Sequence, residues 1–153
     1  MNAIFAMKPE AVALGNAEDK SGIFANLAQL FERGWAIDPE LVAERLQERE
    51  NLGSTGFGRG VAIPHARMPG IRRPVMALLK LDRAINFDAA DGMPVDLVFG
   101  LISPDSSGAT HLRALAAISR MVRDEKMHEA LSEAPDAEAL YGLLTNVTDR
   151  DAA

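Results

Sequence analysis

The apolar positions along the chain follow helical spacing in some segments and form strand-like runs in others, with turn residues between them. Glu18–Phe31 repeats its large apolar residues at helical spacing, which predicts a helix, and Gly34 lies just past its expected end. Asp38-Pro39 predicts the start of a second helix that ends at about Asn51, because aspartate caps free N–H groups and proline suits the first helical position.

A glycine-rich stretch and three apolar runs follow the second predicted helix. The glycines favour a tight, irregular backbone rather than a regular element; they are Gly53, Gly56, Gly58 and Gly60. The apolar runs predict strands at Val61–Ile63, Pro74–Leu81 and Val95–Ile102. Their near-continuous apolarity is typical of strands that are buried on both faces beneath helices.

Three capping residues predict three more helices after the strands. Thr110 can cap a helix with apolar residues at helical spacing, and Asp124 and Asp136 can cap two shorter ones. Helices before and after a group of strands predict an α/β domain, with a mixed β-sheet that is flanked by helices on both faces.

The chain length sets the expected domain organisation. With 153 residues, 48% of them apolar, we expect a single domain over residues 1–153. Its core should span about residues 18–145, because the two ends show weak periodicity or polar composition and are expected to be loose. No apolar run approaches the roughly 18 residues of a membrane span, and the start lacks the features of a signal peptide. We therefore expect a cytoplasmic protein without membrane insertion.

The side-chain inventory excludes several kinds of site. The chain has no cysteine, so thiolate metal sites, disulfides and a cysteine nucleophile are excluded. Its three histidines have none of the usual metal-ligand spacings, and we expect neither a metal nor a cofactor. His128 lies among charged residues, which is typical of a surface position without a role in chemistry.

The charge is acidic overall but basic in one segment. A net charge of −6 argues against nucleic-acid binding, which needs a basic face. The segment Arg59–Arg83, however, contains six basic residues and only one acidic residue, Asp82, so its net charge is +6 − 1 = +5. The segment is either a solvated patch or a site for an anion or an acidic partner.

The stretch Glu48–Arg67, with the sequence ERENLGSTGFGRGVAIPHAR, is the most informative part of the chain. It fails the P-loop pattern because the chain has no Gly-Lys pair. It also fails the kinase glycine loop and the dinucleotide fingerprint, since Val61 occupies the position of the third glycine. An RNA-binding signature fails because Arg59 and Ala62 stand where stacking aromatics are needed.

Three residues remain as candidates for chemistry. His65 follows Ile63-Pro64, and the restricted backbone around a proline gives this histidine a defined direction. His111 begins a predicted helix, where free N–H groups attract anions, and Arg49 ends another helix just before the glycines. Together they could surround one phosphoryl group. Each also has an ordinary structural interpretation. His65 could merely end a strand, His111 could be a partly exposed residue of a first helical turn, and Arg49 could complement a helix dipole.

The sequence GSTGFGRGVAIPHAR resembles the active-site signature of the fructose/mannitol-type IIA proteins (EIIA type-2) of the bacterial phosphotransferase system. The segments Ile85–Pro104, Thr110–Asp124 and Asp136–Leu144 are similar to later parts of that family. The resemblance covers about residues 21–144. Because we expect a free-standing domain, and because the chain has a PVDLVF stretch, it looks most like the nitrogen-regulatory branch. The resemblance implies the fructose/mannitol IIA fold.

The resemblance implies a phosphoryl carrier. A phosphohistidine carrier protein (HPr-like) would donate the phosphoryl group to Nε2 of His65, while the other ring nitrogen donates to a carbonyl or similar acceptor. Arg49 and His111 would stabilise the transferring oxygens, and the basic segment would flank the pocket. The expected role is regulation through protein targets. One alternative is a sugar-uptake component that passes the phosphate to a IIB domain, and another is a binding module that is never phosphorylated.

Overall fold

The computed structural model describes the backbone of residues 4–152 and the side chains of residues 4–146. Six strands form one mixed sheet in the order β1-β5-β6-β3-β2, with β4 also paired to β6. The strands are β1 (Val12–Gly15), β2 (Gly56–Gly58), β3 (Val61–Ala62), β4 (His65–Met68), β5 (Val75–Ile85) and β6 (Val95–Pro104). Strands β5 and β6 are antiparallel, whereas β1 runs parallel to β5, and β3 and β4 run parallel to β6.

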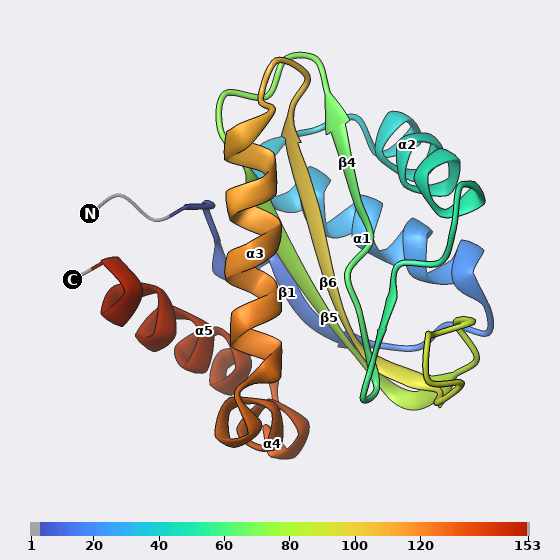
Figure 1. Ribbon diagram of the computed structural model, residues 1–153, viewed down its shortest axis with the longest axis vertical. Helices are drawn as coiled ribbons and strands as arrows, with labels where there is room; N and C mark the ends of the chain where they lie inside the picture. Colours follow the sequence, from blue (N-terminus) through green and yellow to red (C-terminus); the bar gives the residue numbers. More distant parts are fainter. Residues whose placement is uncertain (1–3, 153) are drawn as a thin grey trace.

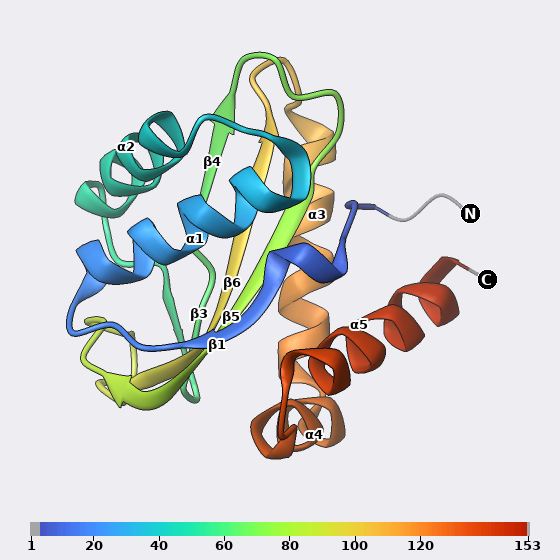
Figure 2. The same cartoon turned by 180° about the vertical axis from the view of Figure 1, so that it is seen from behind.

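Helices cover both faces of this sheet (Figures 1 and 2). The helices are α1 (Lys20–Trp35), α2 (Pro39–Asn51), α3 (Ala109–Arg123), α4 (Glu125–Glu133) and α5 (Ala137–Ala152), and a short 3₁₀ turn spans Pro9–Ala11. Helices α1 and α2 lie on one face, and α3, α4 and α5 lie on the other. The predicted architecture, a mixed sheet between helices, is confirmed.

Two apolar cores lie on the two faces of the sheet, and β6 contributes to both. Val98 and Ile102 belong to the core beneath α1 and α2, whereas Leu97, Phe99 and Leu101 belong to the core beneath α3 and α5. The alternation follows from the two-residue period of a strand. The unbroken apolar run in β6 therefore reflects burial on both faces, as predicted.

Strands β3 and β4 are two parts of one extended segment that is interrupted at Ile63-Pro64. Both parts pair with β6 in the same register, since Ala62 lies opposite Val98 and His65 lies opposite Leu101. Proline has no N–H to give to the ladder, although its carbonyl still accepts from the Leu101 N–H at 3.0 Å. The sheet therefore fixes the backbone on both sides of the interruption, and His65 is the first residue after it.

Several predicted boundaries differ from the structure. Asp19 caps α1 through the Gly22 N–H, and Gly34 lies inside this helix, where an added Cβ would lie 3.4 Å from Cβ of Ala11. Helix α1 ends instead at Trp35, and its C-cap residue Ala36 adopts the left-handed conformation. Helix α3 begins after Gly108, so Thr110 is not its cap, and α5 is longer than predicted. The caps at Asp38, Asp124 and Asp136 are confirmed.

Three short strands were not predicted from the sequence pattern: β1, β2 and β4. Each has only three or four residues, too few for a strand period to stand out. Strand β2 also lies within the stretch predicted to be irregular, and it pairs with β3 as a hairpin. Strand β1 places residues 12–15 of the expected loose N-terminal segment in the sheet, beside β5.

We predict opposite effects for the same substitution at two glycines. A Cβ at Gly56 would lie 2.6 Å from Ala89 Cα, so Gly56→Ala should lower the free energy of unfolding by about 1–3 kcal/mol through overpacking. A Cβ at Gly142 in α5 meets nothing within 4 Å, and Gly142→Ala should raise it by up to about 1 kcal/mol. Urea denaturation measures both, and equal effects would contradict the close approach at Gly56.

Candidate active site

The ring of His65 is held by the backbone just before it. Its Nδ1 lies 2.8 Å from the Ile63 carbonyl oxygen. A carbonyl only accepts hydrogen bonds, so Nδ1 carries the proton of the neutral ring and Nε2 keeps its lone pair. The interruption at Pro64 brings residue 63 and residue 65 into this contact. Nε2 is therefore the ring nitrogen of His65 whose lone pair is free.

His111 lies beside His65 on the same face of the sheet. It sits in the first turn of α3, is only 5% exposed, and its ring centroid lies 5.5 Å from that of His65. Its Nδ1 lies 2.7 Å from Oγ of Ser103, a fully buried residue in β6. Two histidines from elements 46 residues apart therefore line one site, each with its Nδ1 engaged.

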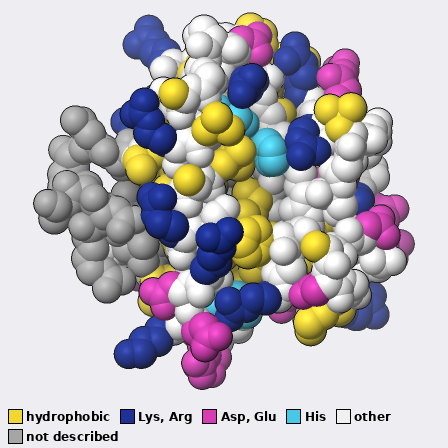
Figure 3. All heavy atoms as spheres, in the orientation of Figure 1, with side chains coloured by type: hydrophobic (Ala, Val, Ile, Leu, Met, Phe, Trp, Pro, Cys, Tyr) yellow, Lys and Arg dark blue, Asp and Glu magenta, His cyan; other side chains and the backbone are white. Residues whose placement is uncertain are grey.

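Arg49 completes the predicted set at the end of α2. Its Nη1 donates to the Gly53 carbonyl at 2.9 Å, which satisfies a carbonyl just past the helix end. Arg49, His65 and His111 all line one open pocket of about 460 Å³. Figure 3 shows histidine side chains on this face with basic and apolar side chains around them. The structure therefore brings the three predicted residues together.

The charge of the pocket is positive although the chain is acidic. Its charged lining consists of Arg45, Arg49, Arg67 and Glu48, which gives +3 − 1 = +2. Cations in a partly desolvated pocket attract an anion several times more strongly than they do in bulk water. The pocket is therefore suited to an anionic group such as a phosphoryl group.

Burial and charge keep both histidines neutral. Desolvation is the main cause that lowers the pKa of His65 below 6.5; the Ile63 hydrogen bond opposes it, while the positive charges of Arg49 and Arg67 add to it. Desolvation also lowers the pKa of His111 to about 4, with further contributions from His65 and Arg67. At pH 7 both rings are neutral, so His65 can act as a nucleophile and His111 can donate one hydrogen bond.

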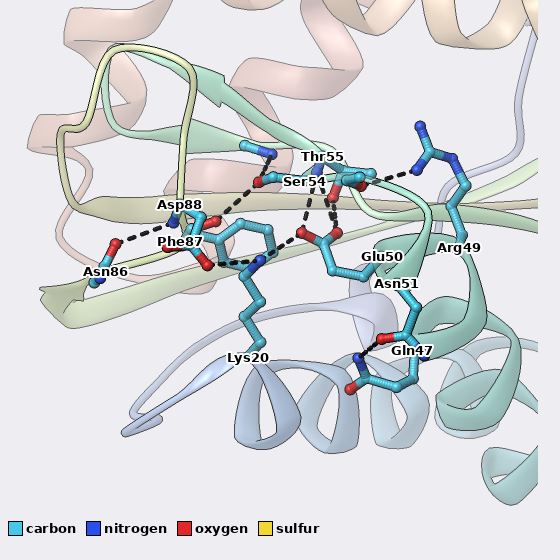
Figure 4. A network of polar contacts seen from close by, with 12 residues as sticks. Lys20, Gln47, Arg49, Glu50, Asn51, Ser54, Thr55, Asn86, Phe87 and Asp88 are labelled. Carbon is cyan, nitrogen blue, oxygen red and sulfur yellow. Dashed lines mark hydrogen bonds and ion pairs between the residues drawn. The ribbon is translucent and has the colours of Figure 1, made fainter.

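A buried carboxylate anchors the turn between α2 and the strands (Figure 4). Glu50 accepts hydrogen bonds from the N–H and the hydroxyl of Thr55, and its Oε2 lies 2.8 Å from Nζ of Lys20 in α1. Ser54 adds a hydrogen bond from its hydroxyl to the Phe87 carbonyl. Arg49 precedes Glu50 on the last turn of α2, so this network fixes the helix end that presents the arginine to the pocket.

The basic segment Arg59–Arg83 does not gather around the pocket as predicted. Among its six basic residues, only Arg67 belongs to the lining. Arg59 pairs with Glu125 at 3.5 Å, and Lys80 donates to carbonyl groups at the end of α4. The segment runs through a hairpin tip and along β3, β4 and most of β5, so its side chains are spread over the sheet. Arg45 and Arg49 in α2 supply the remaining positive charge.

The residues of the site that the sequence analysis did not single out include Glu50, Arg67 and Ser103. Arg67 follows His65 by two positions, so strand alternation would have placed both side chains on one face had β4 been predicted. Glu50 and Ser103 act through contacts with distant residues, and nothing in the local pattern signals these contacts. His128 donates from Nε2 to the Arg59 carbonyl at 2.8 Å, is half-buried, and lies outside the pocket lining.

Among residues 4–146, whose side chains the structure describes, no group of three or more histidine, aspartate or glutamate side chains could hold a metal ion. No helix within that part of the chain is both long and apolar enough to span a bilayer.

Comparison with known proteins identifies the family. Residues 6–147 match the model of the family described as "Phosphoenolpyruvate-dependent sugar phosphotransferase system, EIIA 2". The chain belongs to this family. A protein from Pseudomonas aeruginosa named "Nitrogen regulatory protein" is 42% identical over 129 residues, which is 84% of each chain.

Solved structures agree with this assignment. The nitrogen regulatory protein IIA-Ntr from Neisseria meningitidis is 32% identical with a TM-score of 0.82, over 90% of this chain and 95% of that one. Mannitol IIA from Escherichia coli, solved with phosphorylated mannitol IIB, shares the fold at 19% identity and a TM-score of 0.75, over 93% of this chain and 99% of that one. These relatives support the nitrogen-regulatory branch over the sugar-uptake branch.

We predict that the neutral state of His111 makes stability depend on pH. Below pH 6.5 the unfolded chain protonates this histidine, whereas the folded protein resists protonation until about pH 4. The contribution to stability is therefore fully present above pH 6.5 and is lost as the pH falls toward 4, by up to about 3 kcal/mol. His111→Gln should remove this part of the pH dependence in urea denaturation. A difference between the two proteins that stays constant from pH 7 to pH 4.5 would contradict it.

Proposed function

We propose that the protein is a phosphoryl carrier that takes a phosphoryl group onto Nε2 of His65 from a phosphohistidine carrier protein (HPr-like). The proposal rests on one observation above all. The hydrogen bond from Nδ1 to the Ile63 carbonyl leaves Nε2 as the free nucleophile in a pocket of net charge +2, beside His111 and Arg49. Family membership supports phosphoryl transfer as the class of chemistry.

The transfer exchanges one N–P bond for another. The lone pair of His65 Nε2 forms the new N–P bond while the N–P bond of the donor histidine breaks, and its electron pair returns to the donor ring. The proton on Nδ1 stays in place and continues to donate to the Ile63 carbonyl, which stabilises the charge that the phosphorylated ring acquires. Catalysis is then mainly positioning and charge stabilisation.

The proposed roles of Arg49 and His111 follow from their positions in the pocket. The guanidinium of Arg49 offers several donors to the equatorial oxygens of the phosphoryl group, and His111 offers one neutral donor. A unit charge about 4 Å from an oxygen contributes roughly 4 kcal/mol at an effective dielectric of 20 but only about 1 kcal/mol in bulk water. The benefit therefore grows when a docked partner excludes water from the pocket.

The rim of the pocket suits a protein partner. Leu52 is 85% exposed and Leu112 is 63% exposed, and both belong to the pocket lining. Exposed large apolar side chains beside arginines are typical of protein interfaces. We therefore place the donor carrier on this rim, and after it a regulatory protein target. A IIB domain as acceptor is the alternative, since a mannitol IIA has been solved with its phosphorylated IIB.

Phosphorylation would change the signal that the pocket presents. The phosphoryl group adds about −1.5 to −2 charges, which brings the +2 lining close to neutrality. A partner that recognises the positive, apolar rim would bind one form more strongly than the other. This is a route from phosphorylation to regulation. Because the phosphoryl relay begins with phosphoenolpyruvate, a metabolite of the cytoplasm, we propose that the protein works there.

Phosphoryl labelling tests the assignment of the nucleophile. With phosphoenolpyruvate, the first kinase of the system and the carrier protein, we expect one labelled histidine. His65→Ala should abolish labelling. His111→Ala should slow labelling but leave the phosphorylated residue unchanged, and His128→Ala, the matched control outside the pocket, should label at the normal rate.

Two results would overturn the assignment. Full labelling of His65→Ala would mean that another residue accepts the group. Wild-type protein that takes up no label would favour a binding module that is never phosphorylated. A pull-down with each form then separates a regulatory target from a IIB acceptor.

The role of Arg49 is tested by its effect on rate. Arg49→Ala should raise the barrier of transfer by roughly 2–4 kcal/mol, because the developing charge loses a donor in a partly desolvated pocket. Arg49→Lys should recover only part of the rate, since a lysine lacks the planar fork. Arg33→Ala, an exposed arginine in α1 outside the pocket lining, controls for the loss of charge alone. An unchanged rate in Arg49→Ala would remove this residue from the site.

A further inference from the structure

Ser103 is a fully buried hydroxyl whose single partner is a histidine of the pocket. It lies near the end of β6, where its backbone pairs with Arg67 of β4, and it is 0% exposed. Its Oγ lies 2.7 Å from Nδ1 of His111. Within residues 4–146, whose side chains are described, no other hydrogen bond of this hydroxyl is present.

The hydrogen-bond inventory decides which of the two groups donates. The ring of His111 is neutral at pH 7, with a pKa of about 4, and therefore carries one proton on either Nδ1 or Nε2. If Nδ1 carried it, the buried Ser103 O–H would have no acceptor, which is unfavourable in a protein interior. If Ser103 donates to Nδ1, both groups are satisfied. The serine hydroxyl is therefore the donor, and the proton of His111 lies on Nε2.

The free nitrogen of His111 faces the pocket. Nε2 has no hydrogen-bond partner, yet none of the described side chains has a buried nitrogen or oxygen atom without a partner. Nε2 is therefore accessible from the pocket that His111 lines together with His65.

We propose that Ser103 is a positioning residue that holds His111 in the tautomer with its proton on Nε2, so that His111 donates a hydrogen bond to the phosphoryl group on His65. The inference rests on the proposed function. The two histidines then have opposite tautomers for opposite tasks. The Ile63 carbonyl puts the proton of His65 on Nδ1 and frees Nε2 as a nucleophile, whereas the Ser103 hydroxyl puts the proton of His111 on Nε2 and makes it a donor.

Nitrogen-15 NMR of the full chain tests the tautomers without any phosphoryl transfer. In wild-type protein at pH 7, we expect His111 to show a protonated Nε2 and an unprotonated Nδ1 that accepts a hydrogen bond. His65 should show the reverse. Ser103→Ala should shift the Nδ1 resonance of His111 toward that of a free ring nitrogen or give a mixture of tautomers. Ser103→Thr, which keeps the hydroxyl, should restore the wild-type pattern.

Transfer rates test the consequence. Ser103→Ala should slow phosphorylation of His65 about fivefold, the size expected for one ordinary hydrogen bond, without moving the label. Ser107→Ala is the matched control, because this hydroxyl donates to the Pro104 carbonyl at the same end of β6 and is not the hydrogen-bond partner of either histidine. Unfolding curves show that each variant is folded.

Three results would overturn the inference: a wild-type His111 with its proton on Nδ1, a Ser103→Ala protein with unchanged His111 resonances, or an altered tautomer with an unchanged transfer rate. Failure of the proposed function is distinct from these. In that case the wild-type protein would not be labelled at all, and the tautomer assignment would still be decided by the NMR measurement.

Discussion

The site depends on the hydrogen bond between Nδ1 of His65 and the carbonyl of Ile63. It exists because the strand that pairs with β6 is interrupted at Pro64, while the residues on both sides keep the same register. Pairing with β6 makes the backbone rigid, and Pro64 interrupts the regular strand just before His65. The backbone that the sheet fixes thus holds the Ile63 carbonyl in place, and this carbonyl fixes the orientation and the tautomer of the His65 ring. Without the paired strand or the proline, nothing would fix which ring nitrogen of His65 carries the proton or where the ring points.

The other requirement is neutral rings in a positive pocket. Desolvation and the charges of Arg49 and Arg67 disfavour the imidazolium form of His65. The same conditions favour an anionic group, so in the proposed function the two arginines act on both His65 and the phosphoryl group that it accepts. Their placement depends on contacts distant in sequence, above all on Glu50, which ties the end of α2 to Thr55 and to Lys20 of α1 (Figure 4). A buried ionic network away from the reacting atoms thereby keeps the helix end in position.

The sequence predicted the layers of the fold and singled out three residues that the structure brings into one pocket, but it did not predict how the residues around them are arranged. Long elements such as α2 and β6 have enough residues to show their period, and the order of glycines, proline and histidine is a local signal. The short strand β4 has no such signal, so the place of Arg67 beside His65 could not be anticipated. Ser103 and Glu50 are defined only by partners that folding brings to them. The prediction that the basic segment flanks the pocket was wrong because residues that are close in sequence are spread over the sheet by the fold, and only Arg67 of the segment reaches the pocket.

The central claim is that phosphorus is carried on one atom, Nε2 of His65. The most direct measurement is the phosphorus–nitrogen coupling in NMR of the phosphorylated, nitrogen-15-labelled protein. The account predicts coupling to Nε2 of His65, with the proton of Nδ1 still present and still donating. Coupling to Nδ1 of His65, or to any nitrogen of His111, would contradict it.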